Sequence, residues 1–158
     1  MKLQNKIGIL IASLLIMSAC NDPCKDVNCF NGNCEDGTCI CDEGYLPDGE
    51  GLCKIGRNSL FEGSYATSTT CQGSGSTLQD TLLVEVATAA NEVYIRSFGG
   101  VANNDILTQI NSADVLTVTQ QTTLAGNAYS GNGTRSGSVL SFTLYTDSDT
   151  CQVTMTKQ

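Results

Sequence analysis

Histidine and tryptophan are both absent from this chain of 158 residues, and proline occurs only twice. The lack of histidine removes the commonest general base and a frequent metal ligand. The chain also has no nucleophile elbow, phosphate-binding loop or dinucleotide fingerprint. Asp147 and Asp149 alternate in an expected loop and could form a carboxylate pair, but solvated turn acids explain them better. We therefore expect no catalytic residues and a protein that is not an enzyme.

The N-terminal apolar run is too short to cross a membrane. Lys2 and Lys6 begin the chain, and the eleven residues from Ile7 to Met17 are mainly apolar. A membrane-spanning helix needs ~20 such residues. A positive start, a short apolar core and small residues before a cleavage site are typical of a secretory signal. The sequence therefore predicts a signal peptide over residues 1–19.

The end of this signal resembles the lipobox of bacterial lipoproteins, because it reads Met17-Ser18-Ala19-Cys20. The resemblance implies that Cys20 becomes the N-terminus and carries a diacylglycerol and a further acyl chain, such as palmitate. Several acyl chains hold a protein stably at a membrane, whereas one holds it marginally. We expect a lipid-anchored protein of the bacterial cell envelope, in the outer membrane, with its surface or periplasmic orientation open. An ordinary signal peptide beside an unmodified cysteine is the alternative.

Basic residues are scarce in the exported part of the chain. After residue 19, 16 acidic residues face 6 Lys and Arg, which gives a formal charge of −10. Such a surface repels nucleic-acid phosphates and argues against a polybasic membrane patch. The expected membrane contact is therefore through the acyl chains on Cys20, and no nucleic-acid partner is expected.

Cysteine is abundant and unevenly distributed. Setting Cys20 aside leaves an even number, which in an exported chain predicts a disulfide framework. Six of the eight lie within residues 24–53 and two lie far beyond, which predicts a linker at residues 55–58. The eight are Cys24, Cys29, Cys34, Cys39, Cys41, Cys53, Cys71 and Cys151. Zinc is disfavoured because its sites need paired cysteine knuckles, often with histidine.

The first six cysteines are separated by four, four, four, one and eleven residues, and Cys41-Asp42-Glu43-Gly44-Tyr45 follows the single-residue gap. This pattern resembles an epidermal-growth-factor-like (EGF-like) module, here residues 20–54 with the lipidated N-terminus. The resemblance implies three disulfides, Cys24–Cys34, Cys29–Cys39 and Cys41–Cys53. It also implies a turn at Gly44 and Tyr45, where glycine tolerates a positive φ. A module this short buries little apolar area, and we therefore expect its disulfide bridges to stabilise it.

Some modules of this family bind calcium through an acidic run before the first cysteine. Here Asn21-Asp22-Pro23 stands in that place, and the acidic run is absent. We therefore expect no calcium, no other metal and no cofactor.

Residues 59–158 have no proline and show short alternating apolar runs between Gly, Asn and Ser clusters. This pattern predicts an antiparallel all-β domain. Ala89-Ala90-Asn91 and the segment from Asn132-Gly133 to Ser136-Gly137 are expected to be turns. The expected strands are Phe61–Ser68, Thr81–Thr88, Glu92–Phe98, Ile106–Ile110, Val115–Gln120, Tyr129–Thr134, Ser138–Tyr145 and Gln152–Thr156.

A disulfide between Cys71 and Cys151 would bring their Cα atoms within about 7 Å. The first and last strands would then be neighbours, as in a closed meander. We therefore expect an antiparallel β-barrel or half-barrel, with a β-sandwich as the alternative. Phe61-Glu62-Gly63-Ser64-Tyr65 faintly resembles the Gly-x-Trp opening of lipocalins, which implies a barrel that is either filled or able to hold a small ligand.

Two short motifs suggest modification. Asp80-Thr81-Leu82 resembles the acceptor of some bacterial envelope O-glycosylation systems, which makes Thr81 a candidate site. Asn132-Gly133-Thr134 is a formal N-glycosylation sequon that we interpret as a turn. The expected function is a binding or interaction module for an unknown protein or glycan, with the EGF-like unit as a spacer. A purely structural envelope component and a small-ligand-binding, lipocalin-like barrel are the alternatives.

Overall fold

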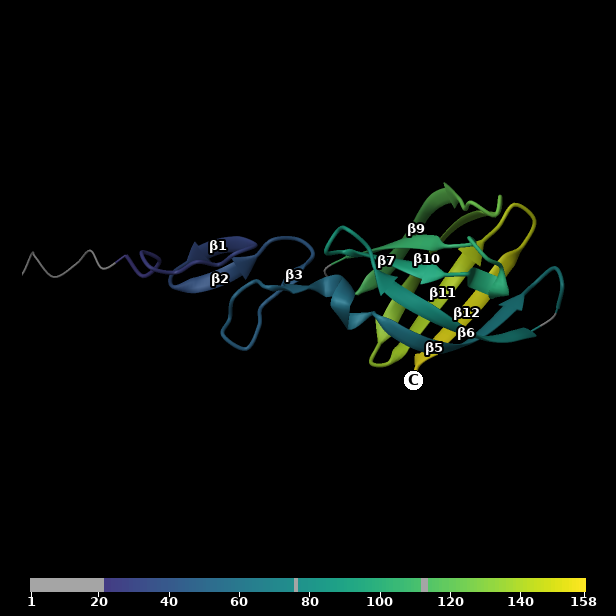
Figure 1. Cartoon of the computed structure of the whole chain (residues 1–158), viewed down its shortest axis with the longest axis horizontal. Coiled ribbons are helices and arrows are strands. Elements are labelled where there is room, and N and C mark those ends of the chain that lie inside the picture. Colours follow the sequence, from purple (N-terminus) through teal and green to yellow (C-terminus); the bar gives the residue numbers. More distant parts are fainter. Residues whose placement is uncertain (1–21, 76, 112–113) are drawn as a thin grey trace, which may run out of the picture.

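The computed structural model describes residues 22–75, 77–111 and 114–158, so the predicted signal peptide and Cys20 lie outside the described residues. Figure 1 shows an elongated small module, residues 22–54, followed by a barrel that extends to the C-terminus. A short 3-10 helix, η1 (Arg57–Leu60), lies between them. No helix in the described residues is long and apolar enough to cross a membrane.

The small module contains one short hairpin, in which β1 (Gly32–Glu35) pairs with β2 (Thr38–Cys41). Its last strand, β3 (Tyr45–Leu46), pairs with β4 (Ile55–Gly56), which follows the module directly. Its disulfides are Cys24–Cys34, Cys29–Cys39 and Cys41–Cys53, the same pairs that the EGF-like resemblance implies.

Little of this module is buried. Cys29 and Cys53 are its buried hydrophobic residues among positions 22–54, while Phe30 and Ile40 are 57% and 51% exposed. A chain of this size cannot form a sufficient apolar core. The three bridges are therefore the main source of its stability, at roughly 2–4 kcal/mol each.

The second part is a closed, eight-stranded, antiparallel barrel in which each strand pairs with the next along the chain. β12 then pairs with β5, so that no sheet edge is left open. The strands are β5 (Gly63–Cys71), β6 (Thr77–Val86), β7 (Glu92–Arg96), β8 (Ile106–Ile110), β9 (Val115–Thr122), β10 (Ala128–Ser136), β11 (Val139–Tyr145) and β12 (Thr150–Lys157).

The closed barrel confirms the all-β prediction and excludes the half-barrel and the sandwich. Each expected strand has a counterpart, and β8 has the predicted bounds. The prediction of a turn at Asn132-Gly133 is wrong, because both residues lie inside β10. A Cβ on Gly133 would approach Phe142 Cδ1 to 2.6 Å, so glycine here permits close contact with β11 instead of a turn. The turn follows at Gly137, which has a φ of 58°.

The barrel interior is filled by its own side chains. Alternate residues of the strands point inward and form one cluster of apolar side chains. At the end next to the small module, Phe61 and Tyr65 are 0% and 1% exposed, and Arg135 lies over the Phe61 ring at 5.2 Å. The Tyr65 hydroxyl donates to the Phe61 carbonyl oxygen at 2.7 Å, and burial raises the pKa of Tyr65. These side chains close the barrel at this end.

Candidate functional site

The end of the barrel farthest from the small module is the candidate site, which we call the distal end. It is formed by the loops β7–β8 (residues 97–105), β9–β10 (123–127) and β11–β12 (146–149), and by the described residues 72–75 after β5. Figure 1 shows these loops on the side of the barrel opposite the small module. Loops held by a rigid scaffold commonly carry binding residues.

A disulfide fixes one side of the distal end. Cys71 and Cys151 are direct cross-strand partners of β5 and β12, with Cα atoms 4.0 Å apart. The sequence predicts the same disulfide and, from it, that the first and last strands of the barrel are neighbours. The bridge closes a segment with a sequence separation of 80, so the chain-entropy model gives a stabilisation of ~4 kcal/mol.

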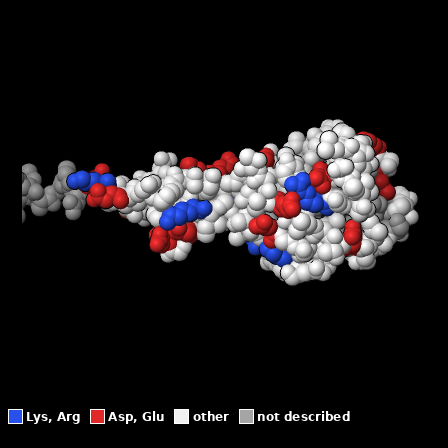
Figure 2. Space-filling view, viewed as in Figure 1, with Lys and Arg blue, Asp and Glu red and all other residues white. Residues whose placement is uncertain are grey.

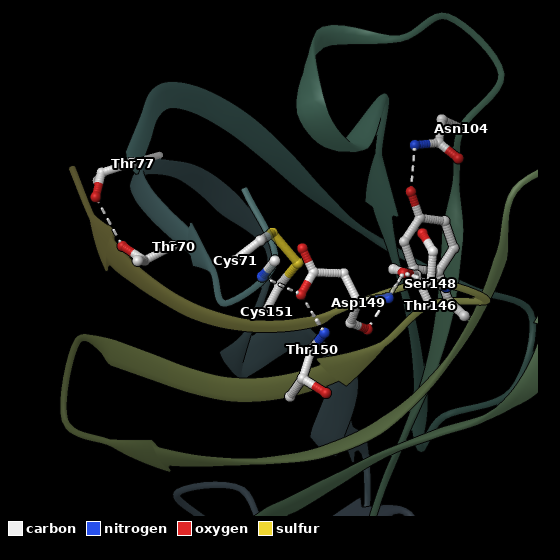
Figure 3. The surroundings of a disulfide bond; sticks show 11 residues. Thr70, Cys71, Thr77, Asn104, Thr146, Ser148, Asp149, Thr150 and Cys151 are labelled. Atoms are coloured by element: carbon white, nitrogen blue, oxygen red, sulfur yellow. Dashed lines mark hydrogen bonds between the residues drawn. A yellow bond between two sulfur atoms is a disulfide. The ribbon is translucent and has the colours of Figure 1, made fainter. Parts of the chain in front are cut away.

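The Asp149 carboxylate holds the loop beside this disulfide (Figure 3). Its Oδ1 accepts the backbone N–H groups of Gly73 at 2.8 Å and Thr150 at 2.7 Å. The Gly73 hydrogen bond is the largest of several that hold the pKa of Asp149 below its usual value. Asp149 therefore has a structural role, and the expectation that Asp147 and Asp149 are solvated turn acids is incomplete for Asp149.

Asn104, in the β7–β8 loop, connects this loop to neighbouring parts of the distal end, and it is only 2% exposed. Its Nδ2 donates to the Phe98 carbonyl oxygen at 2.7 Å and to the Tyr129 hydroxyl at 2.9 Å; Figure 3 shows the second contact. Its Oδ1 accepts from Thr123 Oγ1 at 2.8 Å and from Asn127 Nδ2 at 3.2 Å. One buried amide thus ties the β7–β8 loop to the β9–β10 loop and to β10, which makes this side of the distal end rigid.

A hollow of about 300 Å³ opens between the disulfide and this network. Phe98 and Tyr129 form part of its wall, with ring centroids 5.6 Å apart in an edge-to-face arrangement. Leu78, which is 50% exposed, lies at its rim. The hollow therefore has an apolar wall with hydroxyl groups and the Asp149 carboxylate at its margin, and it is suited to an apolar side chain or a small apolar molecule.

The opposite end of the barrel meets the small module, and we call this contact the junction. The Arg57 N–H donates to the Gly44 carbonyl oxygen at 2.8 Å, and the Asn58 N–H donates to that of Ala90 at 2.9 Å. The Asn58 side chain, which is 7% exposed, donates to the Ala89 carbonyl oxygen at 2.9 Å. Backbone hydrogen bonds therefore run from the module through residues 57 and 58 into the β6–β7 loop.

The predicted turn residues Gly44 and Tyr45 lie at this junction. Gly44 has a φ of 88°, and a Cβ there would lie 3.1 Å from Asn91 Cβ, so both conformation and space favour glycine. The Tyr45 N–H donates to the Asp42 carbonyl oxygen at 3.1 Å and closes the turn.

Electrostatic contacts secure the barrel side of the junction. Asp114 lies between two arginines, with Oδ1 3.0 Å from Arg57 Nη1 and Oδ2 3.6 Å from Arg135 Nη1. The Arg57 side chain is 13% exposed, so this pair is more shielded from solvent than an ordinary surface ion pair.

The remaining predicted residues are spread over the molecule. Thr81 is exposed on β6, and its glycosylation stays a prediction. Cys71, Asp149 and Cys151 bring three potential metal-ligand atoms within 4.8 Å of one another in the described part of the chain. Because the two sulfur atoms are bonded to each other, they provide no thiolate for a metal.

Sequence reasoning missed the residues that organise both ends of the barrel. Asn104 follows Asn103 in a polar loop, where nothing in the sequence distinguishes a buried amide from a solvated one. Arg57 and Asp114 are 57 positions apart, and only the barrel topology brings them together. No family model matches this chain, and no curated protein or solved structure matches it significantly.

Proposed function

We propose that this protein is a lipid-anchored component of the bacterial envelope that holds a β-barrel away from the membrane and presents its distal end to a partner. The order of parts carries the proposal: small module, junction and barrel follow one another in space as in sequence (Figure 1), the distal loops lie at the far end of the barrel, and the predicted anchor precedes the module in the sequence. Three residues separate Cys20 from Cys24, so an acylated Cys20 would place the small module at the lipid surface.

In this proposal the small module is an EGF-like spacer. Three bridges make it stiff, and the hydrogen bonds of Arg57 and Asn58 to Gly44 and Ala90 restrict motion between module and barrel. A stiff spacer keeps the distal loops at a defined distance from the membrane, whereas a flexible linker would let them approach it. The role is binding or interaction, without catalysis.

Replacement of Cys20 by Ser tests the anchor. We expect the native protein to stay with the membrane fraction through a carbonate wash and to be released by detergent, because several acyl chains bind a bilayer stably. The Cys20→Ser variant should appear in the soluble fraction, while the neighbouring Asn21→Ser control should stay with the membrane. Unchanged membrane retention of Cys20→Ser would reject the anchor.

The hollow at the distal end favours a second candidate function, the binding of a small apolar molecule. A fluorescent apolar dye should bind the native protein and bind less well to Leu78→Glu, which places a charge at the rim. Leu83→Glu is the matched control, because Leu83 is 43% exposed on the same strand but outside the hollow. Equal dye binding by both variants would reject this candidate.

A further inference from the structure

Charged side chains are unevenly distributed over this acidic molecule. The small module has eight acidic residues and two lysines. Figure 2 shows acidic atoms along this module and both signs of charge on the barrel face in view. On the barrel, Glu85, Arg96 and Asp105 form a cluster on β6, β7 and the following loop, with Arg96 Nε 2.7 Å from Glu85 and Nη1 2.8 Å from Asp105.

The outer face of β10, β11, β12, β5 and the first part of β6 is different. Successive strands there align their outward residues in rows across the sheet. One row contains an amide or hydroxyl group at every position: Asn132, Thr143, Gln152, Thr70 and Thr77.

The adjacent row repeats this chemistry on the same five strands. Its members are Thr134, Ser141, Thr154, Ser68 and Gln79. Soluble protein surfaces are often ~25–35% charged, so ten such positions would be expected to include about three charged residues. These two rows have none, and together we call them the neutral face.

The neutral face is hollowed and has unpaired polar groups. A shallow depression of about 360 Å³ lies over it, lined by Asn132, Thr134, Ser141, Thr143, Gln152 and Thr154. Thr143 donates to Gln152 Oε1 at 3.1 Å, which leaves the Gln152 amide N–H groups without a partner among the described residues. The Asn132 side chain likewise makes no hydrogen bond within the described part of the chain.

An aromatic side chain lies on the same face of the sheet as this depression. Tyr145 lies on β11 two positions beyond Thr143, points to the same side of the sheet and is 48% exposed. Its ring offers an apolar surface with a polar tip, beside side chains that both donate and accept hydrogen bonds.

We propose that the neutral face binds an uncharged polysaccharide. A hydroxyl-rich chain can pair with both the donors and the acceptors of this face, and the C–H surface of a sugar ring can pack on Tyr145. An anionic ligand is disfavoured by the net negative charge of the exported chain, and a cationic one would find no carboxylate within the two rows of this face. An apolar protein surface would leave the amides unpaired, which costs binding free energy. This site lies outside the distal end and does not depend on acylation of Cys20.

Affinity electrophoresis of the detergent-solubilised mature chain tests this site. The gels would contain a soluble β-glucan, a galactomannan or a xylan, with polygalacturonate as the acidic comparison. We expect retardation by at least one neutral polysaccharide and none by the acidic one. Asn132→Asp combined with Gln152→Glu exchanges amide donors for charge at constant size, and should raise the Kd by about tenfold or more. Tyr145→Ala should weaken binding several-fold.

Matched controls are Asn103→Asp in the β7–β8 loop and Tyr94→Ala on β7, which lie outside the neutral face and should bind as the native protein does. Thermal unfolding of each variant verifies its fold. Lack of retardation by all three neutral polysaccharides, or an equal loss in the controls, would overturn the proposal. Light scattering would detect a dimer of the native protein. A dimer that dissociates on substitution of Asn132 and Gln152 would overturn the proposal and indicate that the neutral face binds a second copy of the chain.

Discussion

The small module buries two hydrophobic residues, Cys29 and Cys53, both within disulfides, whereas the barrel buries a cluster of seventeen hydrophobic side chains and has one disulfide. The module therefore depends on covalent bonds and the barrel on apolar burial. The two parts should respond differently to the same kind of damage.

Loss of a module bridge should have the largest effect. Replacing Cys41 and Cys53 by Ala removes the bridge nearest the junction, and we expect the module to unfold while the barrel stays folded. Hydrogen exchange measured by mass spectrometry would show loss of protection confined to residues 22–54. Retained protection in that range would contradict a stability based on bridges.

Loss of the barrel bridge should be milder. Replacing Cys71 and Cys151 by Ala should lower the free energy of unfolding by roughly 2–5 kcal/mol, the usual range for a lost native bridge. Both parts should still fold, since the apolar core and the three module bridges remain. Denaturant unfolding would measure the loss, and an unfolded barrel would mean that the core alone cannot stabilise it.

The junction should show an intermediate effect. Asn58→Ala removes the hydrogen bonds from its side chain to the carbonyl oxygens of Ala89 and Ala87, at 2.9 and 3.4 Å. Buried acceptors left without donors cost about 1–3 kcal/mol. We expect that drop in unfolding free energy for Asn58→Ala and a smaller one for Ser59→Ala, whose side chain is exposed. Equal stability of the two variants would show that Asn58 does not secure the junction.

The smallest effect concerns pH. Because its pKa is lowered on folding, Asp149 contributes stability that is present above its unfolded pKa, about 3.8, and lost as the pH falls through the folded value. The Tm of the native protein should therefore fall more steeply than that of Asp149→Asn in acid. The Tm difference between the two proteins should shrink below pH 3.8 and stay constant near neutrality. A constant difference at all pH values would contradict this role of the carboxylate.

The fold could be read from the sequence to a large extent because its signals are local. Leu82 and Val84 fall on one face of a strand and Glu85 and Ala87 on the other, and this kind of alternation predicts strands and their inward faces. The positions of Cys71 and Cys151 predict that the first and last strands meet. The predicted bounds of β5 and β6 are less accurate. β5 continues through Thr69 and Thr70, which carry no hydrophobic signal, and β6 begins at Thr77, where a single apolar residue, Leu78, lies among polar ones.

The sites could not be predicted in the same way because they depend on register. The neutral face exists only once Asn132, Thr143 and Gln152 are aligned on neighbouring strands. The sequence predicts a turn at Gly133, because it does not reveal that Phe142 occupies the space of the missing side chain. Asn104 is one of several loop amides, and its burial follows from the packing of the β7–β8 loop against the β9–β10 loop and β10.

The hydrogen bonds of the junction should make module and barrel one stiff unit. Measurement of ¹⁵N relaxation on the Cys20→Ser chain tests this stiffness best, because backbone amides report the tumbling of the part to which they belong. We expect amides of residues 22–54 and of the barrel strands to fit one common, anisotropic rotational correlation time. A distinctly shorter correlation time for the small module would contradict the stiff junction and, with it, the proposed display of the distal end at a fixed distance from a membrane.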